Sequence, residues 1–373
     1  MIKIKVAIAV IHYGEQYLLG YRRAEQHQGN RYEFIGGKIE SNETAKQALI
    51  REVFEEIGLD ISRDSSINPL GILQHYYEDN CTPENSKTVC LNIFRVTLSE
   101  QQYNKFKARK QGSEGQQLQW VSHELLISNK YKLPDANKTI LQWLKLPNLI
   151  SITGDVDTVE SKILQNNSDN SSYNTSSTMP LNQNESRQQW LSYYQQRLPK
   201  KACVYLRVKK LELEQRQKLL LLLLSVRADI NLIIDYELAN YLISNNNLPK
   251  NVIAQHLTQN HINNYYQNAD IKILSPLPIT ASAHDEQSLL LVNKLARERI
   301  ENSLSPVIGV FISPVKNTAT HPNSEALGWD NFADIALTSE MPVIALGGMQ
   351  PEDLNDVREH NGDKVAGITK FLT

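Results

Sequence analysis

The sequence has few cysteines, no excess of positive charge and no long apolar run, and each shortage excludes a class of protein. Its three cysteines, Cys81, Cys90 and Cys203, are an odd number without metal-site spacing, so we expect buried or idle thiols in a reducing compartment. A formal net charge of −2 gives no general attraction to nucleic-acid backbones, so we expect no direct nucleic-acid partner.

No segment has the features of a membrane anchor or a leader. The longest apolar run, Leu219 to Leu224, is far shorter than the roughly 20 residues needed to cross a bilayer. The first residues also lack a basic stretch followed by an apolar one. We therefore expect a cytoplasmic protein without a membrane partner.

The chain is long enough for two domains. With 373 residues it exceeds the size at which one hydrophobic core usually keeps growing. In residues 1–145, strand-like runs such as 4–13 and 88–98 flank isolated helical segments at 44–57 and 136–145. Strands flanking isolated helices indicate an α+β domain.

Residues 146–373 follow a different pattern, in which apolar runs alternate with helical segments. Eight runs have the length of buried strands, at 149–153, 204–208, 231–235, 252–257, 279–284, 307–314, 343–348 and 365–369. This alternation predicts parallel strands, and eight of them predict an α/β (β/α)8 TIM barrel. The tract at about 165–189 is rich in Asn, Ser and Gln, so we expect a disordered insertion between the first strand and its helix.

Three glutamates crowd one face of the predicted helix at 44–57. Glu52, Glu55 and Glu56 stand at i, i+3 and i+4, where like charges cost a helix roughly 0.2–0.5 kcal/mol per pair. A divalent cation would remove this repulsion, and Mg²⁺ fits best because carboxylates and substrate phosphates are its usual ligands, with Mn²⁺ also possible. The glycines Gly36 and Gly37 allow backbone to approach a ligand closely. Taken alone, the cluster also fits an amphipathic helix with a solvated acidic face.

The wider spacing favours the metal site. From Gly37 to Leu59 the segment reads G-x5-E-x7-R-E-V-x-E-E-x-G-L, which resembles the Nudix box of the Nudix hydrolases. The resemblance implies that water splits a nucleoside diphosphate linked to another group. It also implies that Arg51 orients the helix by pairing with a glutamate, with Glu55 within reach. Glu52, Glu55 and Glu56 would bind metal and activate water, and Glu52 is the expected base.

Flanking segments resemble the MutT branch of that family, which hydrolyses oxidised dGTP. They are YRRAEQHQGNRYEFIGGKIE, SEGQ around Glu114, and LPDANKTI, and the likeness covers residues 3–145. The resemblance implies that Glu114 and Gly36 contribute to the metal site. It also implies a nucleotide site made of Arg23, His27, Glu33, Phe34, Ile35, Gly36 and Asn137. Ile35 replaces a proline of the branch, so we expect a less rigid loop here.

Several of the residues expected to bind the nucleotide could instead have a purely structural role. Asn137 has donors and an acceptor suited to a purine edge, but it could instead cap the helix that follows, as could Asp135. Phe34 could stack under a base or fill the core. Arg23 and His27 could be ordinary surface residues.

The second half resembles the thiamine-phosphate synthase and TenI family in YLRVK, AQHLTQ, SPVKNTATHP, ALGGM and VAGI. In a barrel of this type the ligand site lies at the carboxyl ends of the strands. The resemblance implies a thiazole or pyrimidine phosphate as ligand. The candidate ligand residues are Arg207, Lys209, Asp235, Ser282, Thr318, Gly348 and Gly367.

Three positions depart from the synthase pattern. Synthases have Asn, Asp and Lys where this chain has Ile234, His261 and His321. Loss of an acidic residue and a cation would weaken magnesium and diphosphate binding. A barrel kept for ligand binding, tautomerase-like chemistry or assembly is therefore favoured over an intact synthase.

The sequence as a whole predicts a Mg²⁺-dependent enzyme that hydrolyses 8-oxo-dGTP to 8-oxo-dGMP and pyrophosphate. Such an enzyme sanitises the nucleotide pool and prevents replication errors. The alternative is that the barrel sets the role. The chain would then be a thiamine-pathway enzyme or a phosphate-binding module whose first domain acts on another pyrophosphate.

Overall fold

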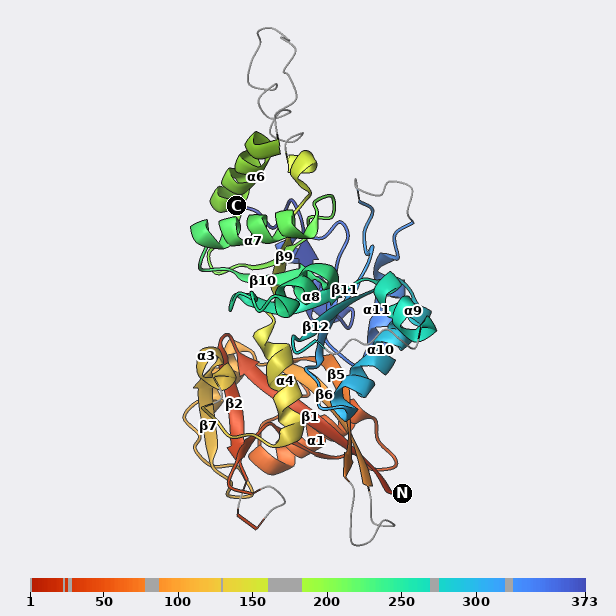
Figure 1. Cartoon of the computed structure of the whole chain (residues 1–373). Coiled ribbons are helices and arrows are strands. Elements are labelled where there is room, and N and C mark those ends of the chain that lie inside the picture. The colour runs from red at the N-terminus through yellow and green to blue at the C-terminus, as the bar shows by residue number, and fades with distance from the viewer. Residues whose placement is uncertain are drawn as a thin grey trace.

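The computed structural model has two structured parts, a mixed sheet with helices and a closed barrel (Figure 1). It describes residues 2–22, 24–25, 29–77, 87–128, 130–159, 183–268, 275–318 and 325–373. The predicted α+β part followed by a TIM barrel is confirmed.

The amino-terminal part is built on a seven-stranded sheet around β1 (Ile2–Tyr13). β1 pairs antiparallel with β2 (Gln16–Tyr21) and β4 (Ile35–Lys38), and parallel with β6 (Lys87–Thr97). β5 (Ser66–Tyr77) pairs with β6, whereas β3 (Tyr32–Glu33) and β7 (Leu118–Ser122) pair with β2. The sheet thus brings β4, which directly precedes the glutamate-rich helix, against the central strand.

That helix is α1 (Ala45–Ile57), and the sequence specifies both of its ends. Thr44 caps its amino end in a capping box, and Gly58 ends it in the left-handed conformation that favours glycine. Leu49 and Val53 are fully buried, so the glutamates lie on the remaining faces. The other helices of this part are α2 (Glu100–Phe106), α3 (His123–Ile127) and α4 (Asp135–Lys145).

The barrel has eight parallel strands, as predicted. They are β8 (Leu149–Ile152), β9 (Cys203–Leu206), β10 (Asn231–Asp235), β11 (Val252–Leu257), β12 (Ile279–Ala283), β13 (Val307–Ile312), β14 (Val343–Ala345) and β15 (Lys364–Gly367). β8 closes the barrel by pairing with both β9 and β15. The helices are α6 (Gln183–Arg197), α7 (Leu213–Val226), α8 (Tyr236–Ser244), α9 (Gln259–Gln267), α10 (Glu286–Glu301), α11 (Gly328–Leu337) and α12 (Leu354–Glu359).

The predicted disordered insertion at 165–189 was wrong at its carboxyl end. Residues 160–182 lie outside the described residues, but residues 183–189 form the first half of α6. Two fully buried aromatic side chains hold this helix on the barrel. The Trp190 Nε1–H donates to the Gly154 carbonyl at 2.9 Å, and the Gly154 N–H donates to the Tyr194 hydroxyl at 2.6 Å. Burial of these two rings offsets the polar composition of the segment.

The amino-terminal part docks on the amino-terminal ends of the barrel strands (Figure 1). Arg95 of β6 pairs with Asp363, the residue before β15, with Nε and Oδ1 2.6 Å apart. Trp143 of α4 donates from Nε1 to the carbonyl of Val307, the first residue of β13, at 3.0 Å. Since ligands of such barrels bind at the opposite, carboxyl ends, the barrel's candidate site points away from the sheet.

The structure also bears on the expectations for the cysteines and for a membrane-spanning segment. Cys90 and Cys203 are buried and unpaired, and Cys81 lies outside the described residues. Burial raises the pKa of the Cys203 thiol to about 12, so this thiol stays protonated and unreactive. Within the ranges that the structure describes, no helix is both long and apolar enough to cross a membrane.

Candidate active site

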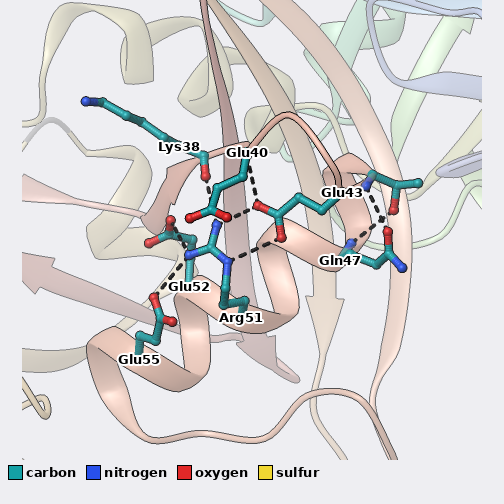
Figure 2. Close-up of polar contacts among 8 residues, drawn as sticks. Lys38, Glu40, Glu43, Gln47, Arg51, Glu52 and Glu55 are labelled. Atoms are coloured by element: carbon teal, nitrogen blue, oxygen red, sulfur yellow. Dashed lines mark hydrogen bonds and ion pairs between the residues drawn. The ribbon is translucent and has the colours of Figure 1, made fainter.

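Arg51, at the middle of α1, contacts three glutamates and the backbone of β4 (Figure 2). Its Nη1 lies 2.8 Å from Glu52 Oε1 and 3.0 Å from Glu55 Oε2. Its Nη2 lies 2.6 Å from Glu43 Oε1 and donates to the Lys38 carbonyl at 3.0 Å. The spacing of the sequence predicts the contact with Glu55, whereas the contacts with Glu43 and Lys38 depend on how β4 meets the helix.

Glu52 is also positioned by the glycine opposite it. A Cβ atom on Gly37 would lie 2.1 Å from Glu52 Oε2, so no larger residue fits without displacing the carboxylate. A Cβ on Gly36 would lie 2.0 Å from the Ala7 carbonyl oxygen of β1. The two glycines therefore let β4 lie between the central strand and the carboxylate of Glu52.

A pocket of about 350 Å³ opens beside the carboxyl-terminal half of α1. It is lined by Gly20, Tyr21, Glu25, Glu33, Ile35, Glu56, Glu114 and Gln116. Burial and the nearby charges of Glu33, Glu114 and Glu52 raise the pKa of Glu56 to about 8. A hydrogen bond from the Gly36 N–H opposes that shift. The pocket therefore concentrates carboxylates that are costly to ionise together.

Glu33 has a cation of its own in this pocket. Its carboxylate pairs with the Arg22 guanidinium, and burial nevertheless raises the pKa of Glu33 above its usual value. The RRA stretch contains both Arg22 and Arg23, and the family resemblance implies a role for Arg23, whereas Arg22 makes this contact. The pairing of Tyr21 with Tyr32 between β2 and β3 brings Arg22 next to Glu33.

The barrel's candidate residues gather at the carboxyl ends of its strands. Arg207 and Lys209 follow β9, Asp235 ends β10, Ser282 lies in β12, Thr318 follows β13, Gly348 follows β14 and Gly367 ends β15. The left-handed φ values of Gly347 (97°) and Gly348 (66°) shape the turn after β14. Ser282 Oγ lies 2.9 Å from His256 Nε2 inside the barrel. His321 lies outside the described residues.

Two of the acidic side chains at this end of the barrel, Asp235 and Glu237, have side-chain partners. Asp235 Oδ1 lies 3.3 Å from Arg216 Nη1 and accepts the Leu238 N–H at 2.9 Å, which caps α8. Glu237 Oε1 lies 2.8 Å from Nε2 of His261, the residue that replaces an aspartate of the synthases. Both carboxylates therefore have partners within the chain.

Two family models match the chain in sequence. The model described as NUDIX domain matches residues 3–144, and the model described as Thiamine monophosphate synthase matches residues 183–371. The chain joins a Nudix domain to a domain of the thiamine monophosphate synthase family. The first strand of the barrel, β8, lies before the second matched range.

Relatives of the Nudix domain act on more than one nucleotide. An 8-oxo-dGTP diphosphatase of Escherichia coli (strain K12) is 29% identical over 146 residues, which are 39% of this chain and 98% of the relative. One from Proteus vulgaris is 42% identical over 79 residues, 21% of this chain and 62% of the relative. A CTP pyrophosphohydrolase of Escherichia coli (strain K12) is 28% identical over 139 residues, 37% of this chain and 89% of the relative. These similarities support pyrophosphate-bond hydrolysis as the reaction class.

The acids of the Nudix pocket suit a divalent cation by charge. Nudix hydrolases generally use such ions. Burial and the like charges of neighbouring glutamates raise the pKa of Glu56, and a bound cation would offset the repulsion between these charges. In the part of the chain that the structure describes, no three His, Cys, Asp or Glu side chains already stand close enough to share an ion. The carboxylates would have to turn toward it, which the half-exposed Glu55 side chain can do readily.

The structure excludes one alternative role for Asn137 in the Nudix domain. Pro134 occupies the capping position of α4 without any side-chain capping bond, and Asp135 pairs with Lys138 at 2.7 Å. Asn137 lies inside the helix, at the third position after Pro134, and is therefore not its capping residue. Asn137 is 5% exposed and follows a loop whose Lys132 carbonyl accepts the Tyr32 N–H of β3 at 2.9 Å.

The other predicted nucleotide residues differ in their placement. The Phe34 side chain is 1% exposed within the main hydrophobic cluster, so it fills the core in this structure rather than offering a face to a base. Ile35 is equally buried and lines the pocket from its inner side. Arg23 and His27 lie outside the described residues.

Proposed function

We propose that residues 1–145 hydrolyse 8-oxo-dGTP to 8-oxo-dGMP and pyrophosphate, and that residues 146–373 form a second domain. The observation that carries the reaction is the pocket lined by Glu33, Glu56 and Glu114, with the charge of Glu52 also acting on Glu56. A triphosphate brings further negative charge into such a site, which only added cations can balance.

The roles follow from how the side chains are held. Glu52 lies between the Arg51 guanidinium and Gly37, and we assign it the role of base toward water. Glu55, Glu56 and Glu114, with the Gly36 backbone, would hold Mg²⁺, or Mn²⁺ in its place. When bound, these ions lower the phosphate charge that repels an incoming hydroxide.

The preference for an oxidised purine rests on Asn137. Its amide offers a donor and an acceptor, which suit a purine edge with an extra carbonyl and N–H. Support comes from the exclusion of the capping role and from the similarity to two 8-oxo-dGTP diphosphatases. The similarity to a CTP pyrophosphohydrolase keeps CTP as the competing substrate.

Asn137→Ala should lower the ratio of kcat/KM for 8-oxo-dGTP to that for dGTP by about 10- to 100-fold, since a site that loses a hydrogen-bond partner discriminates less. Steady-state kinetics on both nucleotides measures the ratio. Asn104→Ala on the exposed surface of α2 serves as the control and should leave the ratio unchanged. An unchanged ratio in Asn137→Ala would disprove the purine-reading role.

Two carboxylates at the carboxyl ends of the barrel strands favour a binding function for the barrel, because they already have partners within the chain. Asp235 and Glu237 already pair with Arg216 and His261, whereas the turn at Gly347 and Gly348 stays suited to a phosphate group. We propose a module that binds a thiazole or pyrimidine phosphate without joining the two.

The full chain mixed with pyrimidine pyrophosphate, thiazole phosphate and Mg²⁺ should therefore form no thiamine phosphate above background. Thiazole phosphate alone should raise the melting temperature. Chromatography of the mixture and a thermal-shift assay measure the two effects. Turnover that Asp235→Asn abolishes would show that the barrel is a synthase after all.

A further inference from the structure

A loop after α2 closes the carboxyl-terminal end of α1. The last carbonyls of a helix have no partner within the helix and need donors from elsewhere. The carbonyl of Glu56 accepts the Ser113 N–H at 2.7 Å and the Gln116 Nε2–H at 3.0 Å. The Glu114 N–H lies 3.5 Å from the same oxygen. One carbonyl of the catalytic helix thus gathers three donors from residues 113–116.

The side chain of Gln116 is fixed in place and connects its loop to the end of α1. Its backbone carbonyl accepts the Gly112 N–H at 2.8 Å, which closes the loop on itself. A Cβ on Gly112 would lie 2.5 Å from Gln116 Cδ and 2.6 Å from the Glu56 carbonyl oxygen, so only glycine leaves room for this amide. Gln116 Oε1 is buried without a hydrogen-bond partner, so the contact that fixes the amide is the donation from Nε2 to Glu56.

The contact between Gln116 and the Glu56 carbonyl links the two segments that carry the pocket's carboxylates Glu56 and Glu114. Glu114 lies between Ser113 and Gln116, which both bind the Glu56 carbonyl, and the side chains of Glu56 and Glu114 line the same pocket. Glu114 comes from an exposed loop, and these bonds hold the backbone of that loop against the end of α1. The side chain of Gln116 thereby helps to hold the backbone that carries the second carboxylate.

We propose that Gln116 is a positioning residue that holds Glu114 beside Glu56 for divalent-cation binding, an inference that rests on the proposed function of the Nudix pocket. Gln116 would act through the backbone carbonyl of Glu56, to which its amide donates. Groups that orient metal ligands in this way typically contribute 10- to 100-fold to metal affinity.

The test is a titration of the full chain with Mn²⁺ in the absence of nucleotide. Electron paramagnetic resonance measures how much Mn²⁺ is bound. Gln116→Met keeps the length and volume of the side chain but removes the donor, so it should weaken Mn²⁺ binding by about 10- to 100-fold. Gly112→Ala, which displaces the amide by another route, should weaken it similarly. Gln117→Met is the matched control, because this neighbouring glutamine is exposed, and it should bind like the wild type.

Two further results separate this inference from the function on which it rests. Wild-type affinity in Gln116→Met and Gly112→Ala, together with loss of binding in Glu56→Gln, would overturn the positioning role and leave the Nudix site intact. Absence of Mn²⁺ binding in the wild type would overturn both. Unchanged thermal midpoints of the two variants would exclude unfolding as the cause of weaker binding.

Discussion

Replacing Glu52 by glutamine should reduce kcat/KM for Mg²⁺-dependent nucleotide hydrolysis by about 10²- to 10⁴-fold, the usual contribution of a positioned general base. Glutamine has the size of glutamate, so it should retain the contact with Arg51 Nη1 and the fit against Gly37. It cannot accept a proton from water. Initial rates of pyrophosphate release measure the loss.

Two comparisons make this result specific. Glu56→Gln should cause a loss of similar size through weaker metal binding, whereas Glu124→Gln on the exposed face of α3 should retain wild-type activity. Circular dichroism should give the same spectrum for all three variants. Full activity in both Glu52→Gln and Glu56→Gln would refute the assignment of the site to α1.

Replacing Asp363 by asparagine should destabilise the protein by about 3–5 kcal/mol, because it leaves buried cations without their carboxylate. Asp363 pairs with Arg95 and with Lys364, at 2.6 and 2.9 Å, and all three side chains are at most 2% exposed. Burial alone would raise the pKa of Asp363, but the charges of Arg95 and Lys364 outweigh it and hold that pKa well below its usual value. The stabilisation is therefore present at neutral pH and is lost only in strong acid.

Arg95→Met should cost less than Asp363→Asn, because Lys364 still neutralises the carboxylate after the arginine is removed. Urea unfolding of the full chain, followed by tryptophan fluorescence, compares the variants. Asp157→Asn breaks the exposed pair with Lys210 and should change stability by no more than about 1 kcal/mol. Equal midpoints for Asp363→Asn and Asp157→Asn would show that the buried ion pair of Asp363 contributes no more to stability than the exposed pair of Asp157.

The elements that the sequence predicts well are those with a local signal. The strands of the barrel are buried on both faces, so each appears as an apolar run such as 231–235 or 307–312. Helix α1 can also be predicted from the sequence, because Thr44 and Gly58 mark its ends and its glutamates follow the spacing of one helix face.

The elements that the sequence does not predict depend on contacts between distant residues. β4 contains Gly36 and Gly37, which are poor strand formers, and its strand depends on distant contacts: Gly36 leaves room for β1 and Gly37 for the Glu52 carboxylate. The pair between Arg95 and Asp363 joins positions 268 residues apart, so no local sequence pattern predicts it. Gln116 lies 60 residues from Glu56, and its role becomes visible only when the loop meets the helix.

We propose that this Nudix domain acts on the oxidised purine triphosphate. The most direct test is kcat/KM of the full chain with Mg²⁺ for 8-oxo-dGTP, dGTP, CTP, ADP-ribose and thiamine pyrophosphate, with the products separated. We expect the highest value for 8-oxo-dGTP, with 8-oxo-dGMP and pyrophosphate as its products. A higher value for CTP or thiamine pyrophosphate, or release of inorganic phosphate from 8-oxo-dGTP, would contradict the proposed function.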